Sequence, residues 1–167
     1  MEIALNGNQI LDLLDHKANL VQYREVENYR TIEQLLGPHK KCVLLYHTSA
    51  DFGHWVCLYQ VGKTIYFFDS YGVMIDDQLK FLPKNLREDM NSSHRYLTNL
   101  LYRSKKMIEY NQHELQKHSP LIQTCGRWCV NRLRYPDISI DDYYKMFKDA
   151  SSEMPMDELI VELVPIN

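Results

Sequence analysis

The stretch HWVCLYQVGKTIYFFDS, residues 54–70, decides the fold. An apolar run lies on each side of Gly62-Lys63, and this arrangement predicts a β-hairpin with a two-residue turn. Because both runs are nearly continuously apolar, we expect the strands to be covered by helices on both faces. A further β-rich run, CVLLYHT at 42–48, extends the predicted sheet.

The rest of the chain reads mainly as helices around these strands. We expect helices at 8–15, 31–37, 93–104, 125–135, 139–150 and 156–164, a short strand at 107–111 and an irregular loop at 112–124. Ser139 is the expected N-cap of the helix at 139–150. The pattern predicts an α+β fold, with a small central mixed β-sheet flanked by helices, in one domain over residues 1–167.

Composition indicates an ordinary globular protein that is not secreted. The 167 residues carry a formal net charge of −3, which does not favour a protein built to coat nucleic acid. The first fifteen residues include acids and lack a basic segment, and no run is long enough to cross a membrane. We therefore expect a reducing, cytosolic setting and four free thiols: Cys42, Cys57, Cys125 and Cys129.

A metal site is the alternative use of two of these cysteines. Cys125 and Cys129 could be combined with His113 and His118 as four ligands. Their spacing does not match the common zinc modules, and the chain has no Cys-x-x-Cys pair. We expect neither a metal nor a cofactor.

Cys125 is the candidate nucleophile. It lies where the irregular loop meets the first turn of a predicted helix, and the unpaired N–H groups of that turn favour a nearby anion such as a thiolate. Gly126 follows and leaves room for a substrate backbone. The alternative is a buried helical cysteine with no chemical role.

A thiol nucleophile needs a base, and the base needs an orienting group. His54 opens a strand directly after Gly53 and beside Trp55, so its ring can face a cleft. Asp69 ends the partner strand, and the hairpin folds so that the two ends come together. We expect His54 and Asp69 to be cross-strand neighbours at one edge of the sheet. Asp69 in the sequence DSYG also suits a turn, and both roles can coexist.

Acyl transfer further requires a donor for the oxyanion that develops on the attacked carbonyl. The Cys125 backbone N–H is one candidate, and Gln116 and Gln123 are side-chain candidates. Gln123 is only two residues before Cys125, and a loop-to-helix turn would aim it away. We therefore prefer Gln116.

The ordered pieces G-H-W, F-D-S-Y-G, L-Q and T-C-G-R-W-C resemble the adenain and Ulp1-type cysteine proteases over roughly residues 40–150. The resemblance implies a nucleophile at the N-terminus of a central helix. It also implies that His54 is the general base, Asp69 the acidic member, Gln116 the oxyanion donor and Cys125 the nucleophile, while Trp55 packs beside the histidine. Gln116 stands nine positions before Cys125, further than in Ulp1-type enzymes.

Within that clan, EYNQHELQ, TCGRWCVNRL and MPMDELIVELV are similar to the small maturation proteases of virophages, Polinton-like elements and large DNA viruses. This resemblance implies an endopeptidase that trims capsid or scaffold proteins in the host cytoplasm, at a viral assembly site or in the virion. No membrane partner is expected. The net charge disfavours a nucleic-acid activator without excluding one.

The same residues also suit other activities. The same fold could serve an isopeptidase acting on ubiquitin or its relatives, as in deubiquitinases and deSUMOylases. An acyltransferase of the YopJ type, using an acyl donor such as acetyl-CoA, has a similar catalytic order. A catalytically dead binding module is disfavoured, because all four functional positions carry competent residues.

Overall fold

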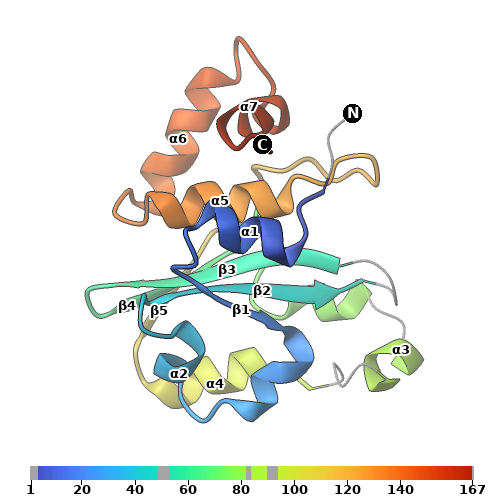
Figure 1. Cartoon of the computed structure of the whole chain (residues 1–167), viewed down its shortest axis with the longest axis vertical. Helices are drawn as coiled ribbons and strands as arrows, with labels where there is room; N and C mark the ends of the chain where they lie inside the picture. Colours follow the sequence, from blue (N-terminus) through green and yellow to red (C-terminus); the bar gives the residue numbers. More distant parts are fainter. Residues whose placement is uncertain (1–3, 49–52, 82–83, 90–93, 167) are drawn as a thin grey trace.

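A five-stranded sheet forms the centre of the molecule, as a computed structural model of residues 4–48, 53–81, 84–89 and 94–166 shows (Figure 1). Along the sheet the strands follow the order of the chain. They are β1 (Asn19–Gln22), β2 (Lys41–His47), β3 (Gly53–Val61), β4 (Thr64–Phe68) and β5 (Met107–Tyr110).

The sheet is mixed, as the sequence predicts. The central strands β2, β3 and β4 are antiparallel, whereas β1 and β5 run parallel to their neighbours at the two edges. The predicted hairpin is present, with Val61 paired to Thr64 across the turn. Gly62 has φ +60°, a left-handed conformation that a glycine adopts without steric cost.

Four helices cover one face of the sheet: α1 (Gly7–Leu13), α5 (Cys125–Arg134), α6 (Ile140–Ala150) and α7 (Met156–Leu163) (Figure 1). The helix α5 lies directly on the strands, and α6 and α7 pack outside it. Trp128 of α5 is fully buried and meets Phe147 of α6 edge to face at 4.7 Å between ring centroids. This aromatic contact helps to fix α5, whose first residue is Cys125.

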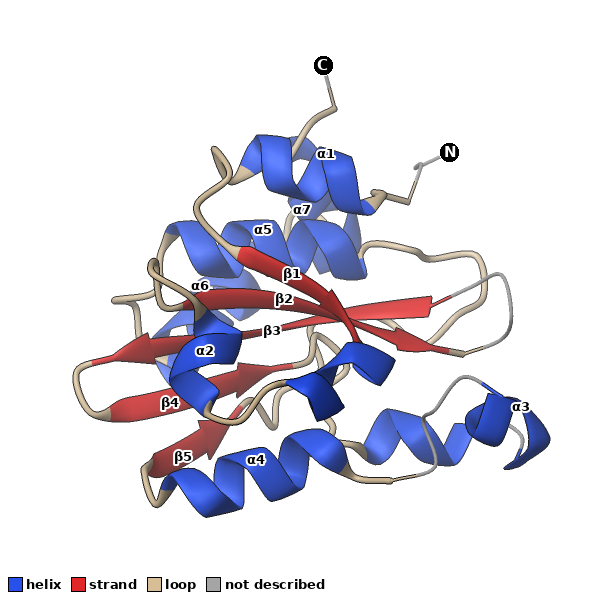
Figure 2. Cartoon of the chain, turned by 60° about the horizontal axis from the view of Figure 1, so that its bottom comes forward, coloured by secondary structure: helices blue, strands red, loops and turns tan. Residues whose placement is uncertain are grey.

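The other face carries α2 (Ile32–Leu36) and α4 (Tyr96–Ser104), together with a 3₁₀ helix at Tyr23–Asn28 (Figure 2). A second 3₁₀ helix, Asp77–Phe81, and the short helix α3 (Lys84–Asp89) follow the hairpin. Each face therefore has its own apolar core. The expectation that helices cover both faces is confirmed.

The predicted elements are present with small shifts of their ends. The helix predicted over 93–104 begins at Tyr96, and position 93 lies outside the described residues. The strand predicted over 64–70 ends at Phe68, so Asp69 lies just beyond it. The sequence did not predict β1, the two 3₁₀ helices or α3, because four to six residues carry too little periodicity to stand out.

The four cysteines are free and buried. Within the described ranges, no helix has both the length and the apolar character needed to cross a membrane.

Candidate active site

A cleft of about 570 Å³ opens at the start of α5. Its walls come from the N-terminal segment, the start of β3, the segment after β4, the loop before α5 and the first turn of α5. His54, Gln116 and Cys125 all line it, although they are distant in sequence.

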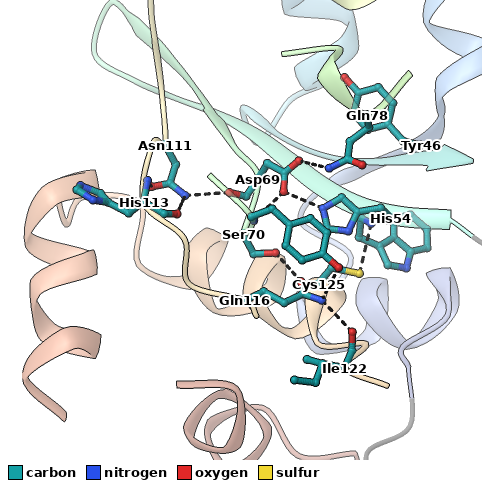
Figure 3. Close-up of polar contacts among 12 residues, drawn as sticks. Tyr46, His54, Asp69, Ser70, Gln78, Asn111, His113, Gln116, Ile122 and Cys125 are labelled. Atoms are coloured by element: carbon teal, nitrogen blue, oxygen red, sulfur yellow. Dashed lines mark hydrogen bonds and ion pairs between the residues drawn. The ribbon is translucent and has the colours of Figure 1, made fainter. Parts of the chain in front are cut away.

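His54 and Asp69 form a buried pair beside this cleft. Nε2 of the imidazole lies 2.8 Å from Oδ1 of Asp69, whose side chain is fully buried (Figure 3). Oδ1 of the carboxylate also accepts a hydrogen bond from the Tyr71 backbone N–H at 2.9 Å, and its Oδ2 accepts one from Gln78 Nε2 at 2.9 Å. These donors fix the orientation of the carboxylate.

His54 and Asp69 come together in a different way from the one that the sequence predicts. The β3–β4 ladder ends at Cys57 and Phe68, and His54 pairs with Tyr46 of β2 instead. The two residues are therefore not cross-strand partners. Asp69 instead reaches His54 from just beyond the end of β4. The predicted proximity is confirmed, and the predicted register of the contact is wrong.

Cys125 completes a three-residue cluster. It is the first residue of α5 and is 8% exposed, and its sulfur accepts a hydrogen bond from the Trp55 backbone N–H at 3.5 Å. Because Nε2 of His54 faces Asp69, Nδ1 is the ring nitrogen left for the thiol. Burial alone lowers the pKa of His54, but the charges of Asp69 and Cys125 outweigh it and raise that pKa to about 10.

With its pKa raised, the His54 ring can carry a proton at neutral pH beside the Cys125 sulfur, and a base next to the thiol is what a cysteine nucleophile needs. The start of α5 adds to it. Thr124 precedes the helix without capping it by its side chain, and the Cys125 N–H has no hydrogen-bond acceptor among the described residues. That N–H is available to an oxygen in the cleft.

Gln116 lies in the cleft but is more constrained than a free donor. Its Nε2 donates to the Ile122 carbonyl at 3.1 Å and to the Tyr71 hydroxyl at 3.3 Å, while its Oε1 accepts from Ser70 Oγ at 2.7 Å. Gln123 also lines the cleft and is exposed. Both hydrogens of the Gln116 amide are thus committed within the protein.

The supporting residues Gly53, Trp55 and Gly126 also line the cleft. Trp55 donates from Nε1 to the Leu5 carbonyl at 3.1 Å and so holds the N-terminal segment. A Cβ on Gly126 would meet Cβ of Leu5 at 3.2 Å. The close approach of the chain's own N-terminal segment therefore favours a small residue at 126, in addition to any room left for a substrate.

Several residues that shape the site were not predicted. Tyr71 stacks on the His54 ring, with 4.5 Å between centroids and 9° between planes, and Gln78 holds Asp69. Asn111 donates to the Asp69 carbonyl at 2.8 Å. Tyr71 lies in the quoted piece F-D-S-Y-G and Asn111 in EYNQHELQ, but neither motif predicted a role for them, and Gln78 lies in no quoted motif.

Asp157 of α7 clamps the loop before α5. It accepts from the Lys117 N–H at 2.9 Å, from Thr124 Oγ1 at 2.6 Å and from Trp128 Nε1 at 3.4 Å. One carboxylate thus ties the middle of the loop, at Lys117, and its end, at Thr124, to the C-terminal helix. The loop forms a wall of the cleft, so α7 contributes to the site without lining it.

Replacing Asp157 with Ala should lower the free energy of unfolding by about 1–3 kcal/mol, because three donors lose their acceptor. Chemical denaturation measures this loss. Glu158→Ala, at the exposed neighbouring position, is the matched control and should stay within about 0.5 kcal/mol of wild type. Equal stability of the two variants would show that the clamp is not stabilising.

The alternative metal set does not assemble in the parts of the chain that the structure describes. No group of three or more His, Cys, Asp or Glu side chains there could hold a metal ion. Cys129 instead lies in the core beside Cys57, where burial raises the pKa of its thiol well above the usual value. His113 pairs with Asp141 at 2.9 Å.

The fold and the cleft define an α+β protein with a cysteine, a histidine and an aspartate gathered at the start of a helix. The chain belongs to the same family as the "Uncharacterized protein V9" of Sputnik virophage. The two are 39% identical over 162 residues, which cover 95% of this chain and 93% of that protein. No family model matches the chain.

Among solved structures, the chain is similar to ChlaDub1 from Chlamydia trachomatis, with a TM-score of 0.40 and 15% identity, over 99% of this chain and 96% of that one. A likeness at this level carries no functional argument.

Proposed function

We propose that this protein is a cysteine endopeptidase in which Cys125 is the nucleophile, His54 the general base and Asp69 the residue that orients it. The supporting observation is the 2.8 Å contact between the His54 ring and the buried Asp69 carboxylate, directly beside a cysteine at a helix start. The raised pKa of His54 supports an ion pair with the thiol.

The proposed reaction is acyl transfer to water. The Cys125 thiolate attacks a peptide carbonyl, and the Cys125 N–H donates a hydrogen bond to the oxyanion. His54, protonated on the nitrogen that faces the sulfur, gives this proton to the leaving amine. Water then attacks the thioester, His54 takes a proton from it, and the thiolate is regenerated.

We propose protein substrates from the virus particle. The kinship with a virophage protein supports a viral setting, and the resemblance to maturation proteases favours capsid or scaffold proteins cleaved at the assembly site or in the virion. No cofactor is required for this chemistry.

Incubation of the purified protein with the structural proteins of its own virus tests the proposal. We expect discrete cuts, located by mass spectrometry, that are absent with the Cys125→Ala variant. Ubiquitin-family probes run in parallel test isopeptidase activity. Rapid reaction with those probes and no cut in any particle protein would contradict the proposed substrate class.

A further inference from the structure

Both N–H hydrogens of the Gln116 side-chain amide are already engaged within the protein. An amide side chain has two such hydrogens. One points to the Ile122 carbonyl at 3.1 Å and the other to the Tyr71 hydroxyl at 3.3 Å. Ser70 holds the opposite end of the amide at 2.7 Å, so the group cannot rotate without breaking three hydrogen bonds (Figure 3).

The hydrogen of the Tyr71 hydroxyl, in contrast to those of the Gln116 amide, is not engaged by any described residue. The hydroxyl accepts a hydrogen bond from Gln116, but no described residue, Cys125 included, accepts a hydrogen bond from it. Tyr71 lines the same cleft as Cys125. Burial and then the neighbouring Cys125 raise the pKa of Tyr71 to about 12, so the hydroxyl keeps its proton at neutral pH and lies within the field of the sulfur.

The Tyr71 ring is held rigidly. It lies between two imidazoles, with His54 at 4.5 Å and 9° on one face and His118 at 4.0 Å and 18° on the other. Its backbone N–H donates to Asp69 Oδ1 at 2.9 Å. The same contacts that fix His54 therefore fix the phenol, which gives the preorganisation that an oxyanion donor requires.

We propose that Tyr71 is a catalytic residue whose O–H donates a hydrogen bond to the oxyanion, together with the Cys125 N–H, while Gln116 acts through Tyr71 as a positioning residue. The inference rests on the proposed function. It changes the expected role of Gln116 from direct donor to the group that orients the phenol. A donor that itself accepts a hydrogen bond is also polarised by it.

The attack on the carbonyl and the collapse of the intermediate require no proton transfer from Tyr71. The sulfur–carbon bond forms, and the π pair of the carbonyl moves onto oxygen, which accepts hydrogen bonds from the phenol and the Cys125 N–H. On collapse this pair returns, the carbon–nitrogen bond breaks, and His54 gives its proton to the amine.

Tyr71→Phe tests the proposal, because it removes only the hydroxyl. With a peptide spanning a cut site identified in the particle proteins, we expect kcat to fall about 10²–10³-fold, as for loss of one oxyanion donor, with KM nearly unchanged. Alkylation of Cys125 by iodoacetamide passes through no oxyanion. Its rate and pH profile should therefore stay within about twofold of wild type.

Tyr66→Phe, a half-buried tyrosine on β4 stacked on Tyr59, is the matched control and should keep full activity. An unchanged kcat in Tyr71→Phe would overturn the proposal. So would an equal loss of alkylation, which would assign the hydroxyl to the thiolate instead. A wild-type protein that cuts nothing would overturn the proposed function itself, a result distinct from either.

A double-mutant cycle distinguishes a Gln116 that acts through Tyr71 from a Gln116 that donates directly to the oxyanion. If Gln116 acts through Tyr71, Gln116→Met should cost much less activity in the Tyr71→Phe background than in wild type. An equal loss of activity in the two backgrounds would contradict action through Tyr71 and return Gln116 to the role of direct donor.

Discussion

Replacing Cys125 with Ala is expected to reduce peptide cleavage by at least about 10⁴-fold, to the background rate. In the proposed mechanism the sulfur forms the acyl intermediate, and neither His54 nor Asp69 can substitute for it. Removing a buried sulfur that lines the cleft at a helix start should leave the fold intact, which thermal unfolding checks. The measurement is kcat/KM on a cut-site peptide.

Cys129→Ala is the matched control, one helical turn further along α5. Cys129 is buried against Cys57 in the core rather than in the cleft. We expect this variant to lose some stability and to retain its cleavage rate. Cleavage that survives Cys125→Ala, or that disappears equally in both variants, would remove Cys125 from the role of nucleophile.

Replacing Asp69 with Asn is expected to lower kcat/KM by about 10²–10⁴-fold. The carboxylate is the acceptor for the His54 ring, the Tyr71 N–H and Gln78, and an amide cannot accept from all three in the same geometry. It also supplies the largest contribution that raises the pKa of His54. Without it, burial favours the neutral ring.

The dependence of the cleavage rate on pH shows the direction of this effect. In wild type the pKa of His54 is about 10, so the imidazolium needed to protonate the leaving amine persists through neutral pH and activity falls only near pH 10. In Asp69→Asn, that alkaline limb should move to lower pH by more than one unit. The stability that His54 contributes is full below its unfolded value of about 6.5 and is lost as pH rises through about 10.

Asp141→Asn is the control for this experiment. It removes a second histidine–aspartate contact of 2.9 Å, between Asp141 and His113, that lies outside the cleft. Its cleavage rate and pH profile should match wild type. An alkaline limb that stays in place in Asp69→Asn would show that Asp69 does not govern the proton on His54.

The sequence predicts the hairpin and the helix that begins at Cys125 because both depend on local patterns: two apolar runs around Gly62-Lys63, and an apolar helical face ended by Pro136. These elements bring His54 and Asp69 together. The contact nevertheless departs from the simple hairpin pairing, since the ladder stops at Phe68 and the chain turns at Asp69. Turn geometry of this kind is not encoded in hydrophobic periodicity.

The rest of the site depends on contacts that no local sequence pattern predicts. Asp157 reaches the loop from the last helix, and Gln78 reaches Asp69 from a 3₁₀ helix that the sequence does not predict. The bonding of Gln116 is equally non-local, because its neighbours Ser70 and Tyr71 are more than forty residues away in the chain. Such long-range polar contacts become visible only once the sheet is assembled.

In the proposed mechanism the sulfur of Cys125 and the ring of His54 act as one ion pair in the cleft. Alkylation of the native protein by iodoacetamide at neutral pH, followed thiol by thiol with mass spectrometry, measures whether they do. Cys125 should react far faster than Cys42, Cys57 and Cys129, and His54→Ala should slow that reaction strongly. Reaction at Cys125 that is no faster than at the core thiols, or that is unchanged in His54→Ala, would contradict the claim.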